Sequence, residues 1–387
     1  MGIIYFDNAA TSWPKPPETI AAMQNYMQNI GGSPGCSGHR LSVEAARIVF
    51  DTRGKLAMLF NVSDPLHIVL TQNATEALNI AIFGFLKPGD HVITSGMEHN
   101  SVMRPLRAME ARGVDVTVIS CDREGLIDPE QIVRAIRKKT KAIFITHASN
   151  VTGTVMPVTD IGRVAREHGL IFCVDAAQTA GCYPIDVAEM NIDLMAFTGH
   201  KSLFGPSGTG GLYIHEGLEK IIEPICVGGT GSRSEVEEQP DFLPDRFEAG
   251  TPNMAGIAGL KAGIEFVLSN GINQIKVKEE NLVKMFIEGV RDLPGIILYG
   301  QTSADRRIPV VSFNIAGMDP GTVALELDEH FNIMLRSGLH CAPCAHKTIR
   351  TYPSGTVRFS FSYFNTKEQI IESIEALKQI SKERKNI

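Results

Sequence analysis

The sequence predicts an α/β protein whose main sheet is mostly parallel and covered by helices on both faces. From about residue 67 onward, short apolar runs alternate with longer amphipathic stretches. Several apolar runs lack polar alternation, which is typical of strands buried on both faces. The repeated strand–helix–strand pattern favours a parallel sheet, because parallel neighbours must be joined by a crossover connection.

The predicted elements alternate regularly along this part of the chain, with apolar runs marking strands and amphipathic stretches marking helices. We expect strands at residues 67–71, 91–95, 114–120, 142–146, 170–174 and 194–197. We expect helices between them at residues 75–86, 101–111, 129–139 and 158–168. A long surface loop, rich in Gly, Ser and Glu, is expected at residues 228–244 and is either disordered or an active-site flap.

The pattern changes after residue 255. Helical patterns become longer and strands sparser, which predicts a second, smaller α+β domain with its boundary near this residue. The helices are expected at residues 258–268, 277–293 and 367–381, and the strands at residues 310–315 and 357–362.

Composition restricts the class of protein. The chain has 387 residues, a formal net charge of −6, 43% hydrophobic and 21% charged residues, which is ordinary for a globular protein and excludes a disordered one. No apolar run approaches the roughly 18 residues that cross a bilayer, and the N-terminus lacks the pattern of a signal peptide. The mild acidity predicts no nucleic-acid or membrane partner. Seven cysteines, an odd number, indicate reduced thiols and a cytoplasmic location.

An acid and a lysine follow two neighbouring predicted strands. Asp175 stands where the strand at 170–174 ends, and Lys201 follows the next strand. Ligands of α/β sheets bind beyond the carboxyl ends of the strands, so both side chains are expected to face one crevice. Such a pair suits pyridoxal phosphate (PLP), whose aldehyde takes a lysine and whose ring nitrogen needs a carboxylate. On this pair alone, a loop-capping Asp and an ion-paired Lys are an equally good interpretation.

A helix start after the predicted strand at residues 67–71 is a candidate phosphate site. Asn73 and Glu76 form a variant of the capping box, which leaves backbone N–H groups and a positive helix end at the edge of the sheet. His99, just past the strand at 91–95, has a ring that can stack on a cofactor or move protons. A histidine at a helix start is, however, more often only a hydrogen-bonding residue.

Thiols and imidazoles gather in one loop near the C-terminus. Cys341 and Cys344, with His340 or His346, have a spacing found in metal sites, but structural zinc needs a second ligand pair that the sequence lacks, so no metal is expected. A second interpretation is a nucleophilic thiolate at Cys341, stabilised by the charges of His340 and Arg336. The third is that both cysteines are incidental.

One arginine lies within a predicted strand. Arg358 is surrounded by apolar residues, and a buried arginine needs an anion. A substrate carboxylate held by two hydrogen bonds would serve, and a structural Asp or Glu partner would serve equally well.

Together these segments resemble the cysteine desulfurase and selenocysteine lyase family of the class V aminotransferases. The resemblance runs nearly from end to end, from residues 5–11 to the strand that carries Arg358. Its most specific motifs are Thr198-Gly199-His200-Lys201, Phe247-Glu248-Ala249-Gly250-Thr251-Pro252 and Arg336-Ser337-Gly338-x-His340-Cys341-Ala342. It implies PLP fold type I, with a mostly parallel seven-stranded sheet in a large domain (residues 15–255). It also implies a small α+β domain, formed by residues 1–14 and 256–387, that carries the catalytic cysteine loop.

The resemblance implies that the chain forms a homodimer and that each subunit binds PLP. Lys201 would bind the cofactor covalently, Asp175 would pair with the ring nitrogen and His99 would stack on the ring. Asn150 and Gln178 would contact the ring oxygen. The phosphate would be held by Ala74, Thr75, Thr198 and His200, and by Thr251 from the partner subunit.

The implied reaction converts L-cysteine to L-alanine. The freed Lys201 would remove the Cα proton, the Cys341 thiolate would attack the substrate sulfur and become a persulfide for an acceptor protein, and His99 would donate a proton. Arg358, Asn8 and Ala9 would position the substrate carboxylate.

Three alternatives remain open at this point. One is a selenocysteine lyase, which would release selenide from L-selenocysteine. Another is a PLP aminotransferase or β-lyase that does not use Cys341. The third is a metal-binding or redox-sensing protein on the same fold, against which the joint presence of Asp175, Lys201 and Arg358 argues.

Two cysteines depart from the family pattern. Cys344 stands where a non-cysteine residue is expected, and Cys36 stands where many relatives place a basic residue that faces the neighbouring active site. We hypothesise that both approach Cys341 at the dimer interface and either relay a persulfide or form a reversible disulfide. The alternative is that Cys344 only packs.

Overall fold

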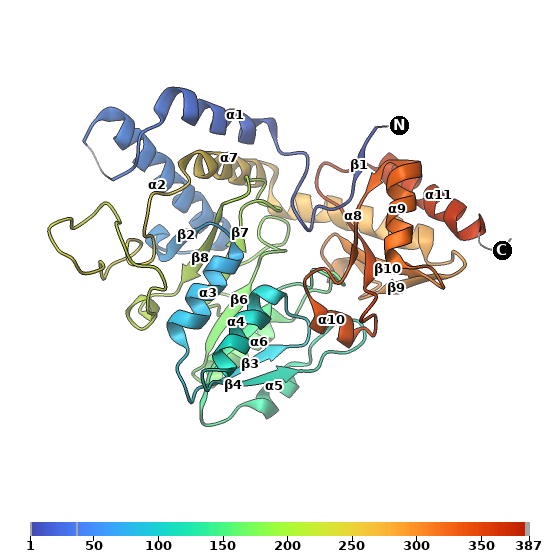
Figure 1. Ribbon diagram of the computed structural model, residues 1–387, viewed down its shortest axis with the longest axis horizontal. Coiled ribbons are helices and arrows are strands. Elements are labelled where there is room, and N and C mark those ends of the chain that lie inside the picture. Colours follow the sequence, from blue (N-terminus) through green and yellow to red (C-terminus); the bar gives the residue numbers. More distant parts are fainter. Residues whose placement is uncertain (1, 36–37, 384–387) are drawn as a thin grey trace.

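The computed structural model describes residues 2–35 and 38–383, in which a seven-stranded sheet lies beside a smaller four-stranded one (Figure 1). The order of the large sheet is β2-β8-β7-β6-β5-β3-β4. Its strands are β2 (Ile68–Thr71), β3 (His91–Ser95), β4 (Asp115–Ile119), β5 (Thr140–Thr146), β6 (Ile171–Asp175), β7 (Leu194–Thr198) and β8 (Gly210–Ile214). The pairs between β4, β3, β5, β6 and β7 are all parallel, which confirms the predicted fold class.

Strand β8 is the element of this sheet that the sequence analysis did not predict. It pairs antiparallel with both β2 and β7 and begins at Gly210-Gly211. A Cβ at Gly211 would lie 2.3 Å from the Phe197 ring, so glycine is required where the strands pack this closely. Glycine carries no strand signal in a sequence, which explains the omission.

Both faces of the large sheet are buried, as the unbroken apolar runs predicted. Along β5, Ile143 and Ile145 face one apolar cluster, whereas Ala142 and Phe144 face another. Helices α3 (Ala74–Phe85) and α4 (Asn100–Glu110) cover one face. The other face is covered by α2 (Arg40–Phe60), α5 (Pro129–Ala135), α6 (Val158–Glu167) and α7 (Met254–Asn270).

The smaller sheet is antiparallel, with the order β12-β13-β10-β9. Its strands are β9 (Ile296–Tyr299), β10 (Val310–Ile315), β12 (Arg336–Gly338) and β13 (Thr356–Ser360). Its core contains a group of packed rings from Phe6, Phe286, Phe313, Phe359 and Phe361. Helices α8 (Ile272–Val290), α9 (Pro320–Phe331) and α11 (Lys367–Glu383) pack beside it.

The N-terminal residues belong to this smaller unit. Strand β1 (Ile4–Tyr5) pairs in parallel with β11 (Ile333–Met334), and both chain ends lie on the same side of the molecule (Figure 1). The backbone N–H of Ala9 donates to Ser360 Oγ at 2.8 Å, which fixes residues 7–9 beside β13. The exact division of the chain into domains stays a prediction.

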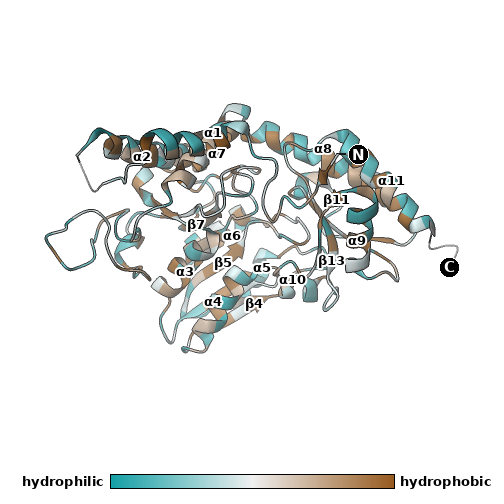
Figure 2. Ribbon diagram, turned by 45° about the horizontal axis from the view of Figure 1, so that its top comes forward, coloured by the Kyte–Doolittle hydropathy of each residue, from teal (hydrophilic) through white to brown (hydrophobic). Residues whose placement is uncertain are grey.

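The predicted helices agree with the observed ones to within a few residues, but α1 (Pro17–Asn25), α2, α9 and the short α10 (Pro343–Thr348) were not predicted. Helix α1 starts after Pro16 without a side-chain cap, and α2 is capped by the ring of His39. Neither residue is a usual helix-start signal. Figure 2 shows hydrophilic and hydrophobic residues mixed along both helices. No helix within the described ranges is long and apolar enough to cross a membrane.

Residues 228–244 form neither helix nor strand and are mostly exposed, as expected of a surface loop. The backbone N–H of Gly228 donates to Gln239 Oε1 at 3.0 Å, and Gly250 N–H donates to Gly229 O at 2.7 Å. None of these residues, all of which are described, lines the cavity discussed below.

Candidate active site

The carboxyl ends of β5, β6 and β7 open into a cavity of about 230 Å³ that lies between the two sheets. Thr146, Asp175 and Thr198, the last residues of these strands, form its floor. The smaller unit contributes Arg336 and Arg358 from β12 and β13. The remaining lining residues are Ala9, Ala10, Asn73, Ala74, Thr75, His99, Ser101, Asn150, Ala177, Gln178, His200, Lys201 and His340.

Lys201 and Asp175 share this cavity, as the sequence predicted. The buried carboxylate accepts the backbone N–H of Ala177 at 2.9 Å. Burial raises the pKa of Asp175, and the charge of Lys201 partly offsets that rise. Burial lowers the pKa of Lys201 to about 8, which Asp175 opposes and the two arginines reinforce. The amine is therefore available in its neutral form close to neutral pH.

The start of α3 forms the other end of the cavity. Asn73 Oδ1 accepts the N–H of Glu76 at 2.9 Å, and Glu76 Oε2 accepts the N–H of Gln72, the residue before the N-cap, at 2.6 Å, so a variant of the capping box is present. Ala74 and Thr75 occupy the first turn of this helix. The positive helix end and the Thr75 hydroxyl suit an anion.

His99 is the N-cap of α4 and its Nδ1 is an acceptor. Nδ1 accepts the backbone N–H of Ser101 at 3.1 Å and lies 2.9 Å from Ser101 Oγ. An acceptor nitrogen carries no proton, so the proton of the neutral ring is on Nε2. Burial, with added repulsion from Lys201 and nearby arginines, lowers the pKa of His99 to about 4.

Arg358 has the carboxylate partner that one interpretation expected. Its Nη2 donates to Asp7 Oδ1 at 2.8 Å, and its Nη1 donates to Asn150 O at 3.1 Å. Its Nε is buried without a partner among the described residues. Asp7 was not singled out in the sequence, although it directly precedes the predicted Asn8 and Ala9.

The loop that carries Cys341 is held by two other segments. Asn150 Nδ2 donates to His340 O at 2.7 Å, and the N–H of Asn100 donates to Cys341 O at 2.8 Å. His340 and Cys341 both have positive φ, 48° and 57°, a conformation that costs energy for residues other than glycine and that clusters at functional sites.

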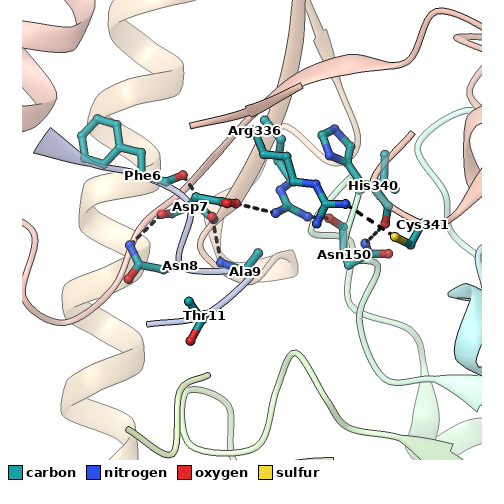
Figure 3. Close-up of polar contacts among 12 residues, drawn as sticks. Phe6, Asp7, Asn8, Ala9, Thr11, Asn150, Arg336, His340 and Cys341 are labelled. Atoms are coloured by element: carbon teal, nitrogen blue, oxygen red, sulfur yellow. Dashed lines mark hydrogen bonds and ion pairs between the residues drawn. The ribbon is translucent and has the colours of Figure 1, made fainter. Parts of the chain in front are cut away.

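The sulfur of Cys341 lies at the exposed edge of the site. It accepts a hydrogen bond from Arg336 Nη2 at 3.5 Å (Figure 3). It also lines a second hollow of about 450 Å³, which shares Thr75, His99 and Ser101 with the main cavity. Arg336 thus connects the thiol to the cavity that holds Lys201.

Of the remaining predicted residues, one lines the cavity and the others lie outside it. Gln178 lines the cavity, where its Nε2 donates to Ala9 O at 3.1 Å. Asn8 does not line the cavity, and its Nδ2 donates to Ser360 O and to Asn365 Oδ1. Thr251 is exposed outside this chain's cavity, in a segment held by the Arg53–Glu248 ion pair. Cys344 is half-buried on α10 (Pro343–Thr348).

Two further observations concern the cysteines. Cys36 lies outside the described residues, so the arrangement of the three cysteines stays a hypothesis. Every cysteine that is described is free, and no cluster of three or more metal-ligating side chains occurs in those parts of the chain.

A buried carboxyl group, missed in the sequence, lies beside the site. Glu98 Oε1 accepts Ser95 Oγ–H at 2.5 Å and Thr146 N–H at 3.0 Å. Burial raises the pKa of Glu98 from 4.5 to about 8, the two hydrogen bonds oppose this rise and Asp175 adds to it. A glutamate that directly follows a strand gives no sequence signal of such burial.

We expect Glu98→Gln to stabilise the cofactor-free chain at pH 7. Between pH 4.5 and 8 the folded chain retains a proton that the unfolded chain has released, so wild-type stability falls as the pH rises. Glutamine keeps the acceptor oxygen but does not titrate. The gain is expected to be on the order of 3 kcal/mol at pH 7 and to vanish toward pH 4.5, as measured by urea unfolding. Parallel stability curves for the two proteins would contradict this.

The cavity fits PLP on its own chemistry. It offers an amine and a carboxylate on one side and a helix start on the other. Three buried polar atoms of its lining residues, His200 Nδ1, His340 Nδ1 and Arg358 Nε, have no partner among the described residues, so a polar ligand that reached them would satisfy them.

Comparison with known proteins gives consistent matches. Residues 4–372 match the family model for Aminotransferase class-V. A probable cysteine desulfurase of Methanothermobacter thermautotrophicus is 38% identical over 98% of this chain and 94% of its own. The cysteine desulfurase of Escherichia coli O157:H7 is 31% identical over 98% of this chain and 93% of its own. The apo structure of a cysteine desulfurase from Thermococcus onnurineus superposes with a TM-score of 0.91 at 35% identity, covering 98% and 95% of the two chains.

Proposed function

This chain belongs to the class V aminotransferases and is a cysteine desulfurase, and from this premise we propose how its residues carry out the reaction. The family, the fold and the enzyme class predicted from the sequence are thereby confirmed. The relatives named above do not favour the selenocysteine lyase or the aminotransferase alternative.

The cavity is proposed to bind PLP, with Lys201 as its covalent anchor and Asp175 at its ring nitrogen. Asn150 and Gln178 are proposed to contact its ring oxygen. Bound PLP supplies an electron sink for the charge that develops on Cα when its proton is removed. The phosphate would be held by Ala74, Thr75, Thr198 and His200, and by Thr251 of the partner subunit.

The substrate carboxylate is proposed to lie between the two arginines. Asp7 and Asn150 O hold the Nη atoms of Arg358 in place, which leaves its Nε as a fixed donor. Arg336 contributes the second guanidinium. Ala9 lines this side of the cavity, and Asn8 fixes the backbone behind it.

Lys201 is proposed to remove the Cα proton. Burial lowers the pKa of its amine to about 8, which makes the neutral base accessible near neutral pH. Asp175 and both arginines line the same cavity as this amine, so a carboxylate bound by the arginines would bring Cα toward Lys201.

Cys341 is proposed to accept the sulfur as a thiolate. Its attack forms an S–S bond to the substrate sulfur while the Cβ–S bond breaks, and the electrons of that bond remain on the three-carbon fragment, which takes up a proton and leaves as alanine. Arg336 stabilises the thiolate through its hydrogen bond to Sγ. His99 is proposed to carry the proton that the fragment needs.

A single observation carries this proposal: Lys201 and Asp175 share a cavity with Arg336, which holds Cys341 Sγ at 3.5 Å. The test is to measure products from L-cysteine and, in parallel, from L-selenocysteine, with purified protein and PLP. We expect alanine from cysteine, with the sulfur recovered as sulfide after a thiol reductant is added. Formation of a keto acid without alanine would instead support an aminotransferase or β-lyase, and turnover of selenocysteine alone would support the lyase.

A homodimer, a sulfur-acceptor protein and a cytoplasmic location complete the proposal. Exposed apolar side chains on α1, on the π-helical turn that follows it (Tyr26–Ile30) and on α2, among them Ile20, Met27, Val43 and Phe50, offer a surface for a second copy. The position of Thr251 outside its own cavity agrees with a role in the partner's site.

A further inference from the structure

Cys341 lies in a four-residue turn (residues 339–342) whose backbone shape its own side chains do not favour. The N–H of Ala342 donates to Leu339 O at 2.9 Å and closes the turn, and both central residues, His340 and Cys341, have positive φ. Among the standard β-turns only type I′ has positive φ at both central positions, where Gly, Asn and Asp dominate. Histidine and cysteine carry a Cβ that makes this shape costly, so contacts from outside the turn must stabilise it.

Three hydrogen bonds from other segments reach this turn (Figure 3). The ring of His340 is buried, and its Nε2 donates to Thr356 O at 3.1 Å. The backbone N–H of Asn100 donates to Cys341 O at 2.8 Å. The Nδ2 of Asn150 donates to His340 O at 2.7 Å. Because Asn100 acts through its backbone, Asn150 provides the contact that a side-chain substitution removes without altering the turn itself.

Asn150 also holds Arg358, through its own backbone. Its carbonyl oxygen accepts a hydrogen bond from Arg358 Nη1 at 3.1 Å, and the residue is buried in the wall of the main cavity. One residue thus contacts both the arginine proposed to bind the substrate carboxylate and the turn that carries the thiol. An amide nitrogen has two N–H groups, so the bond to His340 leaves one for the cofactor oxygen.

We propose that Asn150 is a positioning residue for Cys341, whose amide holds the turn in its left-handed conformation and keeps the thiol at a fixed distance from Arg358. The substrate carries its carboxylate and its sulfur on one three-carbon unit, so its sulfur meets Cys341 only if the two binding groups keep their spacing. The inference rests on the proposed function for the roles of Arg358 and Cys341.

The turn depends on such a contact because the remaining hold on the thiol is weak. The bond from Arg336 Nη2 to Cys341 Sγ is 3.5 Å long and lies at the exposed edge of the site. Without the Asn150 amide, the two central residues can return to negative φ, which L-residues prefer. That change would move Sγ away from Arg336 and from the cavity.

The test measures hydrogen exchange at the Ala342 amide in the full-length chain, without cofactor and without cysteine. This N–H closes the turn, so its exchange rate reports how often the turn opens. We expect Asn150→Ala to raise that rate by about fivefold, as for the loss of one hydrogen bond. Mass spectrometry with fragmentation that resolves single amides provides the rate.

Cys341→Gly tests whether the turn is strained. Glycine takes positive φ without the penalty of a Cβ, so this variant is expected to slow exchange at Ala342 by about fivefold. In the Asn150→Ala background the same glycine is expected to return the rate to near that of wild type. If glycine slowed exchange in neither background, the idea of a strained turn held from outside would be wrong.

Gln178→Ala is the matched control. Gln178 lines the same cavity and is the other residue proposed to contact the ring oxygen, but its Nε2 donates to Ala9 O and not to the turn. Its substitution is expected to leave exchange at Ala342 unchanged. A rise equal to that of Asn150→Ala would assign the effect to a general loosening of the cavity and would overturn the proposal.

A second amide shows whether the effect is confined to the turn. The N–H of Gly153 donates to Ser149 O at 2.9 Å, in the segment that contains Asn150 itself. Asn150→Ala is expected to leave exchange at Gly153 unchanged. An equal rise at Gly153 and Ala342, or no rise at Ala342, would overturn the proposal. Because no turnover is measured, the result is independent of whether the chain forms alanine.

Discussion

Replacing Cys341 by alanine is expected to reduce alanine formation from L-cysteine by at least about 10³-fold, because the thiol is the only acceptor proposed for the substrate sulfur. The binding of PLP is expected to be unchanged, since Cys341 does not line the main cavity. The measurement is the rate of alanine formation, with the visible absorption of the bound cofactor recorded on the same samples.

Cys344 provides the matched control. It lies three residues further along the chain, is half-buried on α10 and lines neither hollow of the site. Cys344→Ala is expected to retain alanine formation close to that of wild type. A comparable loss in both variants would contradict a role confined to Cys341 and would favour the persulfide relay. Full activity in Cys341→Ala would contradict the proposed sulfur transfer.

Replacing Lys201 by alanine is expected to reduce alanine formation by about 10³-fold or more, because no other neutral amine lines the described cavity to accept the Cα proton. The variant is also expected to lose the covalent attachment of PLP and to bind it only reversibly. Gel filtration separates the two cases, since reversibly bound cofactor dissociates during the run.

Lys15 is the control for a general effect of charge. Its amine donates to Ser12 Oγ and to His200 O, both at 2.7 Å, and burial lowers its pKa to about 8, as for Lys201. Lys15 does not line the cavity, so Lys15→Met is expected to cause a much smaller loss. A primary amine such as methylamine is expected to restore part of the activity of Lys201→Ala but not to affect Lys15→Met. Absence of any such rescue, with intact folding, would argue against Lys201 as the base.

Much of the site could be predicted because its residues follow local signals. Asp175 is the last residue of β6 and Lys201 follows shortly after the end of β7, and strand ends are visible as the limits of apolar runs. The helix start at Asn73 has a capping box within a few residues of sequence, and the structure contains it. Where the signal was weak, as at Gly210-Gly211 of β8, the element was missed.

The residues that complete the site were not visible in the sequence. Asp7 and Arg358 are 351 positions apart, so neither reveals that the other satisfies its charge. Glu98 is buried only because β3 and β5 lie side by side in the sheet. Thr75 and Ser101 meet because the starts of α3 and α4 converge on one cavity.

The sequence by itself determined the order and type of the elements that form the parallel part of the large sheet, and the identity of the residues with reactive groups. These properties depend on periodicity and on motifs that span a few residues. The tertiary structure alone decided the direction in which the pKa of each buried group is shifted. It also decided that Arg358 is held by Asp7 and that Arg336 contacts Cys341, and how His99 is connected to the start of α3. Burial and hydrogen-bond partners set these charges, and both arise from chain segments that the sequence keeps far apart.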